Sequence, residues 1–176
     1  MLTGGEAVRV LGIDPGTATL GWGVIDHQGS STQAVAYGAL LTPPEMAPEM
    51  RLKSLFEGLS AIRDEWRPDA AAVEKLYFGQ NSRTALAVGQ ARGIVLLVLA
   101  QGGLPYAEMA PSEVKQAVTG YGRADKRQVQ LMVQRLLGLE TYPKPDDVAD
   151  ALAIAICGAE HLRFQKTSGA LSTQKW

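Results

Sequence analysis

The first forty residues are a succession of apolar runs separated by short polar breaks. The run Val8–Asp14 ends on an acidic residue and is followed by Pro15-Gly16, which predicts a buried strand that ends in a loop. Apolar and polar residues then alternate over Thr19–Asp26 and again over Thr32–Leu41, which predicts two more strands. Because the links between these strands are short, we expect an antiparallel meander.

The remainder of the chain carries mostly helical periodicity, with two further short strands. Helices are predicted over Glu49–Trp66, Ser82–Ala100, Pro111–Val118, Lys126–Leu137 and Asp147–Phe164, and strands over Ala70–Glu74 and Leu104–Met109. This order of elements predicts an α/β fold, in which one mixed five-stranded sheet carries helices on both faces. We expect residues 1–7 to be an N-terminal extension, residues 8–164 to form a single domain, and residues 165–176 to be a disordered tail.

One predicted helix has more apolar surface than a single domain of this size can cover. Every residue from Ile94 to Leu99 is apolar, so apolar side chains point in all directions around this part of the helix Ser82–Ala100. A sheet covers only one face of a helix that packs on it. We therefore expect a second copy of the chain to cover the other face, in a homodimer that forms through helix 82–100.

Composition narrows the class of protein. The length of 176 residues, with 46% hydrophobic and 20% charged residues, is ordinary for one soluble globular domain. The single cysteine, Cys157, excludes an internal disulfide and is expected in the core. The chain does not start like a signal peptide, and its longest apolar stretch, Ile94–Ala100, is too short for a bilayer, so we expect a cytoplasmic location and no membrane. The net charge of −1 argues weakly against nucleic acid, but four acids bound to metal would leave the rest of the chain net positive.

Four carboxylates stand where functional sites of α/β folds usually lie. Asp14 and Glu74 each close an apolar strand, and the functional crevice of an open α/β sheet lies beyond the carboxyl ends of its strands. Asp147 and Asp150 share one face at the start of the last helix. Asp147 can also simply complement the helix dipole, whereas Asp150 lies on the border of the apolar face that packs on the sheet. Neighbouring carboxylates repel each other unless a cation lies between them, and oxygen ligands suit Mg²⁺ or Mn²⁺. The pattern predicts a two-ion site for phosphodiester hydrolysis.

Four segments, in order along the chain, resemble the motifs of one nuclease family. They are VLGIDPGTATLGWGVID (Val10–Asp26), AAVEKLYFGQNSRTALAVGQARG (Ala71–Gly93), YAEMAPSEVKQAVTGYGRADKRQVQ (Tyr106–Gln130) and DDVADALAIAI (Asp146–Ile156). Together they resemble the RuvC family of crossover junction endodeoxyribonucleases. The resemblance implies a ribonuclease-H-like fold and a structure-selective endonuclease, a homodimer that resolves four-way Holliday junctions by symmetric, metal-dependent cleavage during recombination and repair.

The resemblance also implies roles for individual residues. The family's catalytic, metal-binding acids fall on Asp14, Glu74, Asp147 and Asp150, and Asp147 stays open between metal ligand and base because some relatives carry histidine there. The resemblance further implies Mg²⁺, with Mn²⁺ as a substitute, two ions per subunit, and a branch-migration motor complex as a partner.

A second group of residues is expected to contact DNA. The family's intercalating aromatic falls on Tyr77 or Phe78, and both stay open. Its phosphate-binding lysines fall on Lys115 and Lys126, in a basic stretch that also contains Arg123 and that, taken alone, also fits a solvated helix face. Asn81 and Arg83 begin a helix beside Glu74, where free N–H groups can hold phosphate.

Other functions fit parts of the same pattern. Asp14-Pro15-Gly16-Thr17 also resembles the phosphate loop of sugar kinases and actin-like ATPases, but those proteins need a second lobe for which 176 residues leave no room. Another ribonuclease-H-like nuclease, acting on RNA or RNA–DNA hybrids, is disfavoured by the apolar helix 82–100. A junction-binding module without catalysis is disfavoured because all four acids are present.

Overall fold

The computed structural model describes residues 7–75 and 82–167, without the side chains of 82–84 and 163–167. Ten elements follow one another in the order expected from the sequence: β1 (Val8–Asp14), β2 (Thr19–Gln28), β3 (Ser31–Leu41), α1 (Pro48–Trp66), β4 (Ala70–Glu74), α2 (Ser82–Gln101), β5 (Tyr106–Met109), α3 (Pro111–Thr119), α4 (Lys126–Leu136) and α5 (Asp146–Thr167).

The five strands form one mixed sheet in the order β3-β2-β1-β4-β5. The predicted meander is confirmed, because β2 runs antiparallel to both β1 and β3. β4 lies parallel to β1, and β5 lies parallel to β4. The carboxyl ends of β1, β4 and β5 therefore meet at one edge of the sheet.

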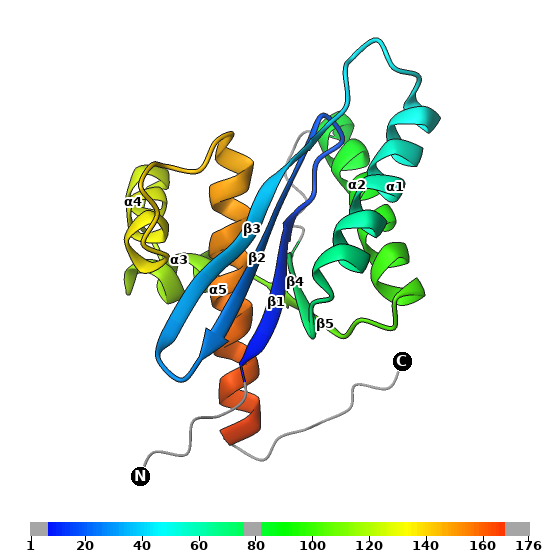
Figure 1. The fold of residues 1–176 in the computed structure, drawn as a ribbon. Coiled ribbons are helices and arrows are strands. Elements are labelled where there is room, and N and C mark those ends of the chain that lie inside the picture. The colour runs from blue at the N-terminus through cyan, green and yellow to red at the C-terminus, as the bar shows by residue number, and fades with distance from the viewer. Residues whose placement is uncertain (1–6, 76–81, 168–176) are drawn as a thin grey trace.

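Helices cover both faces of the sheet, as predicted (Figure 1). α1 and α2 lie on one face, and α5 lies on the other with α3 and α4 packed outside it. Each face has its own core: alternate strand residues such as Leu11 and Val73 enter the core beneath α1 and α2, while Val10 and Ala72 enter the core around α5. This alternation decides on which side of the sheet each functional side chain emerges.

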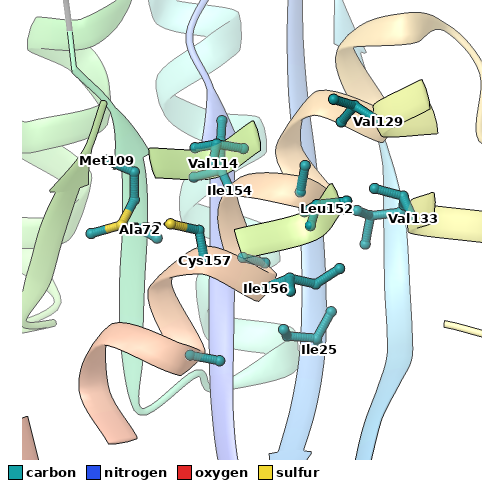
Figure 2. Close-up of a cluster of buried hydrophobic side chains, with 14 of the residues drawn as sticks. Ile25, Ala72, Met109, Val114, Val129, Val133, Leu152, Ile154, Ile156 and Cys157 are labelled. Atoms are coloured by element: carbon teal, nitrogen blue, oxygen red, sulfur yellow. Dashed lines mark hydrogen bonds between the residues drawn. The ribbon is translucent and has the colours of Figure 1, made fainter. Parts of the chain in front are cut away.

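The core around α5 is built largely from small aliphatic residues, together with sulfur (Figure 2). Figure 2 shows Cys157 and Met109 side by side, where the thiol donates to the methionine sulfur over 3.4 Å. Burial raises the pKa of the Cys157 thiol to about 12. The expectation that Cys157 is a core residue is therefore confirmed.

Glycines allow α5 to lie unusually close to the sheet. A Cβ on Gly12 of β1 would stand 2.1 Å from the carbonyl oxygen of Ala151, and one on Gly23 of β2 would stand 2.5 Å from a methyl group of Leu152. At Gly158 the situation is reversed, because there the helix supplies the glycine and Ala72 of β4 lies beneath it. These contacts fix the axis of α5 against three neighbouring strands.

Several boundaries differ from the sequence-based expectation by one to three residues, most of all in β5 and α5. β5 begins at Tyr106 instead of residue 104, because the backbone N–H of Leu104 is bonded to Leu99 at the end of α2. α5 begins at Asp146, one residue early, and ends at Thr167, three residues late, since Gln165 and Lys166 are good helix formers that extend it beyond its apolar part. In the described part of the chain, no helix is long and apolar enough to cross a membrane.

Candidate active site

Asp14 and Glu74 lie side by side at the carboxyl edge of the sheet. Ile13 of β1 is in register with Val73 of β4, so Asp14 and Glu74 occupy the next pair of positions, on strands about 4.8 Å apart. Asp14 and Val10 lie an even number of residues apart on β1, as do Glu74 and Ala72 on β4, so each pair shares one face of the sheet. Val10 and Ala72 enter the core around α5, so the side chains of Asp14 and Glu74 also emerge on the face that carries α5. The predicted pairing of these acids follows directly from the strand register.

The start of α5 brings Asp147 over the same point of the sheet. Asp14 is paired with Gly21 of β2, and a Cβ on Gly21 would stand 2.0 Å from the carbonyl oxygen of Asp147 and 3.0 Å from its Cβ. Asp150 follows one helical turn later on the same face of α5. The two strand acids and the two helix acids therefore form one cluster, which is defined here as the acid cluster.

The charges of the acid cluster act on one another. Burial raises the pKa of Asp14 to about 7, and the negative charges of Glu74, Asp150 and Asp147 add to the effect. No described residue donates a hydrogen bond to the carboxylate of Asp14 or to that of Glu74. A buried carboxylate with like charges around it and no donor is a group that a cation would stabilise.

Glu74 and Asp150 show the same effect in weaker form. Burial, followed by the charge of Asp150, raises the pKa of Glu74. Burial also raises the pKa of Asp150, although the nearby charge of Lys126 partly offsets it. All three acids thus gain from a positive charge in the space between them.

Lys126 stands at the rim of the acid cluster. It is the first residue of α4, after the N-cap Asp125, and its ammonium lies 3.3 Å from a carboxylate oxygen of Asp146 and 3.3 Å from one of Asp150. Burial alone would lower the pKa of this lysine, but the charge of Asp150 and hydrogen bonds to both acids raise it. Gln130 of α4 also donates a hydrogen bond to the carboxylate of Asp146 over 2.9 Å. Because Asp146 contacts two side chains of α4, it is not counted in the acid cluster.

The acid cluster offers carboxylate oxygens, which are the kind of ligand that a hard divalent cation prefers, but the cluster is open. Within the described ranges, no three His, Cys, Asp or Glu side chains stand close enough to form a finished metal-binding group. Asp150 is paired with the ammonium of Lys126 over 3.3 Å. Closing the ligand set would require Asp150 to exchange the ammonium for a cation deeper in the cluster.

Arg92 ties the strand that bears Glu74 to the opposite layer of the molecule. From α2 it donates a hydrogen bond of 2.9 Å to the main-chain carbonyl of Glu74, and it forms an ion pair with Glu108 of β5. The arginine side chain is only 13% exposed. Sequence reasoning missed this residue, and the one available signal was a charged side chain inside a largely apolar helix.

The residues expected to contact DNA are placed only in part. Lys115 lies half-buried on α3, and Arg123 is exposed in the loop between α3 and α4, on the side of the sheet that carries the acid cluster. Tyr77, Phe78 and Asn81 lie outside the described residues, and Arg83 belongs to the first turn of α2 with its side chain outside them. Lys126, which is also expected to contact phosphate, contacts Asp146 and Asp150 in this structure.

The chain is similar to known proteins along most of its length. The family model for "crossover junction endodeoxyribonuclease RuvC" matches residues 10–158. A protein of that name from Chloroflexus aggregans is 60% identical over 152 residues, which are 86% of this chain and 93% of the relative. Another, from Syntrophomonas wolfei, is 48% identical over 166 residues, which are 94% of this chain and 95% of the relative.

Solved structures lead to the same family. T. thermophilus RuvC in complex with a Holliday junction substrate superimposes with a TM-score of 0.85 at 36% identity, covering 89% of this chain and 96% of that one. The yeast mitochondrial Holliday junction resolvase Ydc2 shares the fold, with a TM-score of 0.61 at 14% identity over 92% of this chain and 84% of its own. The expected ribonuclease-H-like fold is confirmed, and the chain belongs to the RuvC family of crossover junction endodeoxyribonucleases.

Proposed function

We propose that Asp14, Glu74, Asp147 and Asp150 form the catalytic centre with which this chain cuts four-way DNA junctions. Membership of the family makes the chain a divalent-metal-dependent crossover junction endodeoxyribonuclease. The observation that carries the residue assignment is the side-by-side placement of Asp14 and Glu74 without a donor, directly beneath the first turn of α5. The comparisons do not favour the alternative of an RNA or RNA–DNA hybrid nuclease.

The metal would be Mg²⁺, with Mn²⁺ as a substitute, at two ions per subunit. Asp14 would be shared by both ions because it has Glu74 on one side and the acids of α5 on the other. Glu74 would complete one site, and Asp150 with Asp147 would complete the other. When bound, such ions activate water and stabilise the leaving oxygen at phosphorus.

The chain's own residues have a second task, which is to hold the DNA backbone at the acid cluster. The basic side of the site consists of three residues: Lys115 on α3, Arg123 in the loop between α3 and α4, and Lys126 at the start of α4. Phosphate contacts of this kind give affinity and salt dependence but no choice of sequence. Tyr77 or Phe78, together with Asn81 and Arg83, are proposed to contact DNA from the segment that follows β4.

The proposed dimer is supported by the uncovered face of α2. Leu86 is 67% exposed and Leu97 is 47% exposed, although Val95, Val98 and Leu99 of the same helix are buried. Gly89 and Gly93 would have nothing within 4 Å of an added Cβ, so this face has room for a close helix partner. Leu97→Glu should give a monomer in sedimentation at micromolar concentration, and a wild-type monomer under the same conditions would refute the proposed dimer.

One further partner and a cellular location complete the proposal. A branch-migration motor complex is proposed from family membership alone, and binding of the purified motor to this chain would test it. A cytoplasmic location is proposed because the substrate is DNA.

The deciding experiment compares wild type and Asp14→Asn on a synthetic mobile four-way junction with Mg²⁺ or Mn²⁺. Wild type should nick two strands symmetrically. Asp14→Asn should lose cleavage by at least about a thousandfold while it still binds the junction, because the variant removes no phosphate contact. Normal cleavage by Asp14→Asn would refute the residue assignment. Failure of the wild type to cut any junction would refute the function itself.

A further inference from the structure

Thr42 carries a buried hydroxyl just beyond the end of β3. It is 4% exposed, and it is the one buried residue with a polar side chain in the described part of the chain. The hydroxyl donates a hydrogen bond of 2.5 Å to the main-chain carbonyl of Thr17, and the backbone N–H of Thr42 donates one of 3.0 Å to the carbonyl of Ala18. Thr42 thus holds two successive carbonyl groups of the loop that joins β1 to β2.

Arg51, near the start of α1, holds Thr42 in turn. Its Nε donates to the hydroxyl oxygen of Thr42 over 2.8 Å, and its Nη2 donates to the main-chain carbonyl of Thr42 over 3.2 Å. Because the hydroxyl oxygen accepts from the guanidinium, the single hydroxyl hydrogen is left to donate to Thr17. These contacts are defined here as the arginine–threonine network, which consists of Arg51, Thr42 and the carbonyl groups of Thr17 and Ala18.

The arginine–threonine network reaches the chain close to Asp14. Pro15 and Gly16 are the only residues between Asp14 and the first carbonyl that the network holds. The ring of Pro15 fixes its own φ and also restricts the backbone of Asp14 before it. A Cβ on Gly16 would stand 2.3 Å from the carbonyl oxygen of Thr19, so the turn is tightly closed. A displacement of the held carbonyl would therefore pass to the main chain of Asp14.

The main chain matters for Asp14 because its carboxylate has no hydrogen-bond donor among the described residues. Carboxylates that bind metal are usually oriented by hydrogen bonds from neighbouring groups. Without such bonds, the direction of the Asp14 carboxylate depends on how the backbone at the end of β1 is held. The strand ladder holds this backbone up to the pair of Asp14 and Gly21, and the arginine–threonine network holds the loop beyond it.

We propose that Arg51 and Thr42 are positioning residues for DNA cleavage, which fix the loop after β1 and thereby hold the Asp14 carboxylate in the acid cluster. The inference rests on the proposed function, since it needs Asp14 as a catalytic residue. It gives α1 a part in the reaction, although α1 and α5 lie on opposite faces of the sheet (Figure 1). Neither residue touches DNA or metal in this role.

The test measures single-turnover cleavage of a synthetic four-way junction by the full-length protein with Mg²⁺, and junction affinity in EDTA. Thr42→Val replaces the hydroxyl by a methyl group, and it should lower the cleavage rate about tenfold or more while junction affinity changes by less than about twofold. Thr42→Ser keeps the hydroxyl and should restore most of the rate. Arg51→Met should lower the rate in the same way, and Arg51→Lys should recover part of it.

Arg9→Met is the matched control. Arg9 is also a half-buried arginine that donates to a side chain and to a main-chain carbonyl, those of Asp26 and Trp66, but it lies near the amino end of β1. Its loss should lower the Tm and leave the cleavage rate unchanged at a temperature at which all variants are folded. A loss of rate in Arg9→Met equal to that in Thr42→Val would indicate general loosening of the fold and overturn the positioning role.

Binding of Mn²⁺ to the DNA-free protein, measured by electron paramagnetic resonance, gives a readout without cleavage. Thr42→Val should weaken Mn²⁺ binding severalfold and Thr42→Ser should not, because Asp14 is the acid that both ions would share. An unchanged cleavage rate or an unchanged Mn²⁺ affinity in both Thr42→Val and Arg51→Met would overturn the positioning role and leave the proposed function intact. Normal cleavage by Asp14→Asn would instead overturn the proposed function.

Discussion

Removing the charge of Asp14 should make the metal-free protein more stable. Burial and the surrounding acids raise the pKa of this carboxyl to about 7, whereas an aspartate in the unfolded chain titrates near 3.8. At about 1.4 kcal/mol per pH unit, the charged form costs the folded state up to about 4 kcal/mol. Because the neighbouring acids share part of this repulsion, we expect Asp14→Asn to recover roughly 2 to 4 kcal/mol at pH 8.

The pH dependence gives the prediction its sign. Near pH 4 the carboxyl is protonated in the folded chain and about 40% protonated in the unfolded chain, so the gain from Asp14→Asn should fall below about 1 kcal/mol. Between about pH 4 and pH 7 the unfolded chain loses the proton while the folded chain retains it, and the wild type loses stability as pH rises. Above about pH 7 both forms are charged and the difference levels off.

The assay is thermal unfolding in EDTA at fixed protein concentration, at pH 4 and at pH 8. For a chain of this length, the gain at pH 8 corresponds to a rise in Tm of roughly 4 to 16 °C. Asp64→Asn is the control: Asp64 is exposed and paired with Arg63, so its loss should change Tm little at either pH. If Asp14→Asn proves less stable than wild type at pH 8, the picture of a buried, repelled carboxylate is wrong.

Three further predictions concern residues around the site. Gly21→Ala would place a methyl group 2.0 Å from the carbonyl oxygen of Asp147, so we expect a loss of about 1–3 kcal/mol in denaturant unfolding together with lost cleavage; wild-type stability would contradict the close approach. Arg92 anchors the main chain at Glu74, so Arg92→Met should lower kcat and raise the metal concentration for half-maximal cleavage, and Arg92→Lys should restore part of both. An unchanged metal dependence in Arg92→Met would count against this role of Arg92. The Cys157 thiol should react with iodoacetamide only after unfolding, since burial raises its pKa to about 12; fast labelling of the folded protein would refute its burial.

The fold was predictable because its periodicities are clear. The apolar run of β1, the alternation in β2 and β3 and the short links between them identified the meander. The acidic residues at the ends of β1 and β4 predicted a site at the carboxyl edge of the sheet. What the sequence could not provide is the side of the sheet on which each acid emerges relative to α5. That depends on register, because a shift of one residue between β1 and β4 would send Asp14 and Glu74 to opposite faces.

Long-range polar contacts were beyond sequence reasoning for a different reason. Nothing in the spacing of Lys126 indicates that its ammonium lies between Asp146 and Asp150, because that contact depends on how α4 and α5 pack. Arg92 was missed for the same reason, since its partners lie on β4 and β5. Charged residues on helices have many possible partners, and only the tertiary structure selects among them.

The close approach of α5 connects the stability of the fold to the chemistry of the acid cluster. Asp147 reaches the level of Asp14 because Gly21 has no side chain, so the same missing Cβ permits both dense packing and the crowding of negative charge. A bulkier residue at position 21 would relieve the repulsion by moving the helix outward, and it would also separate the carboxylates. The cluster therefore keeps its electrostatic cost because the packing that imposes this cost is also the packing that places four carboxylates around one site.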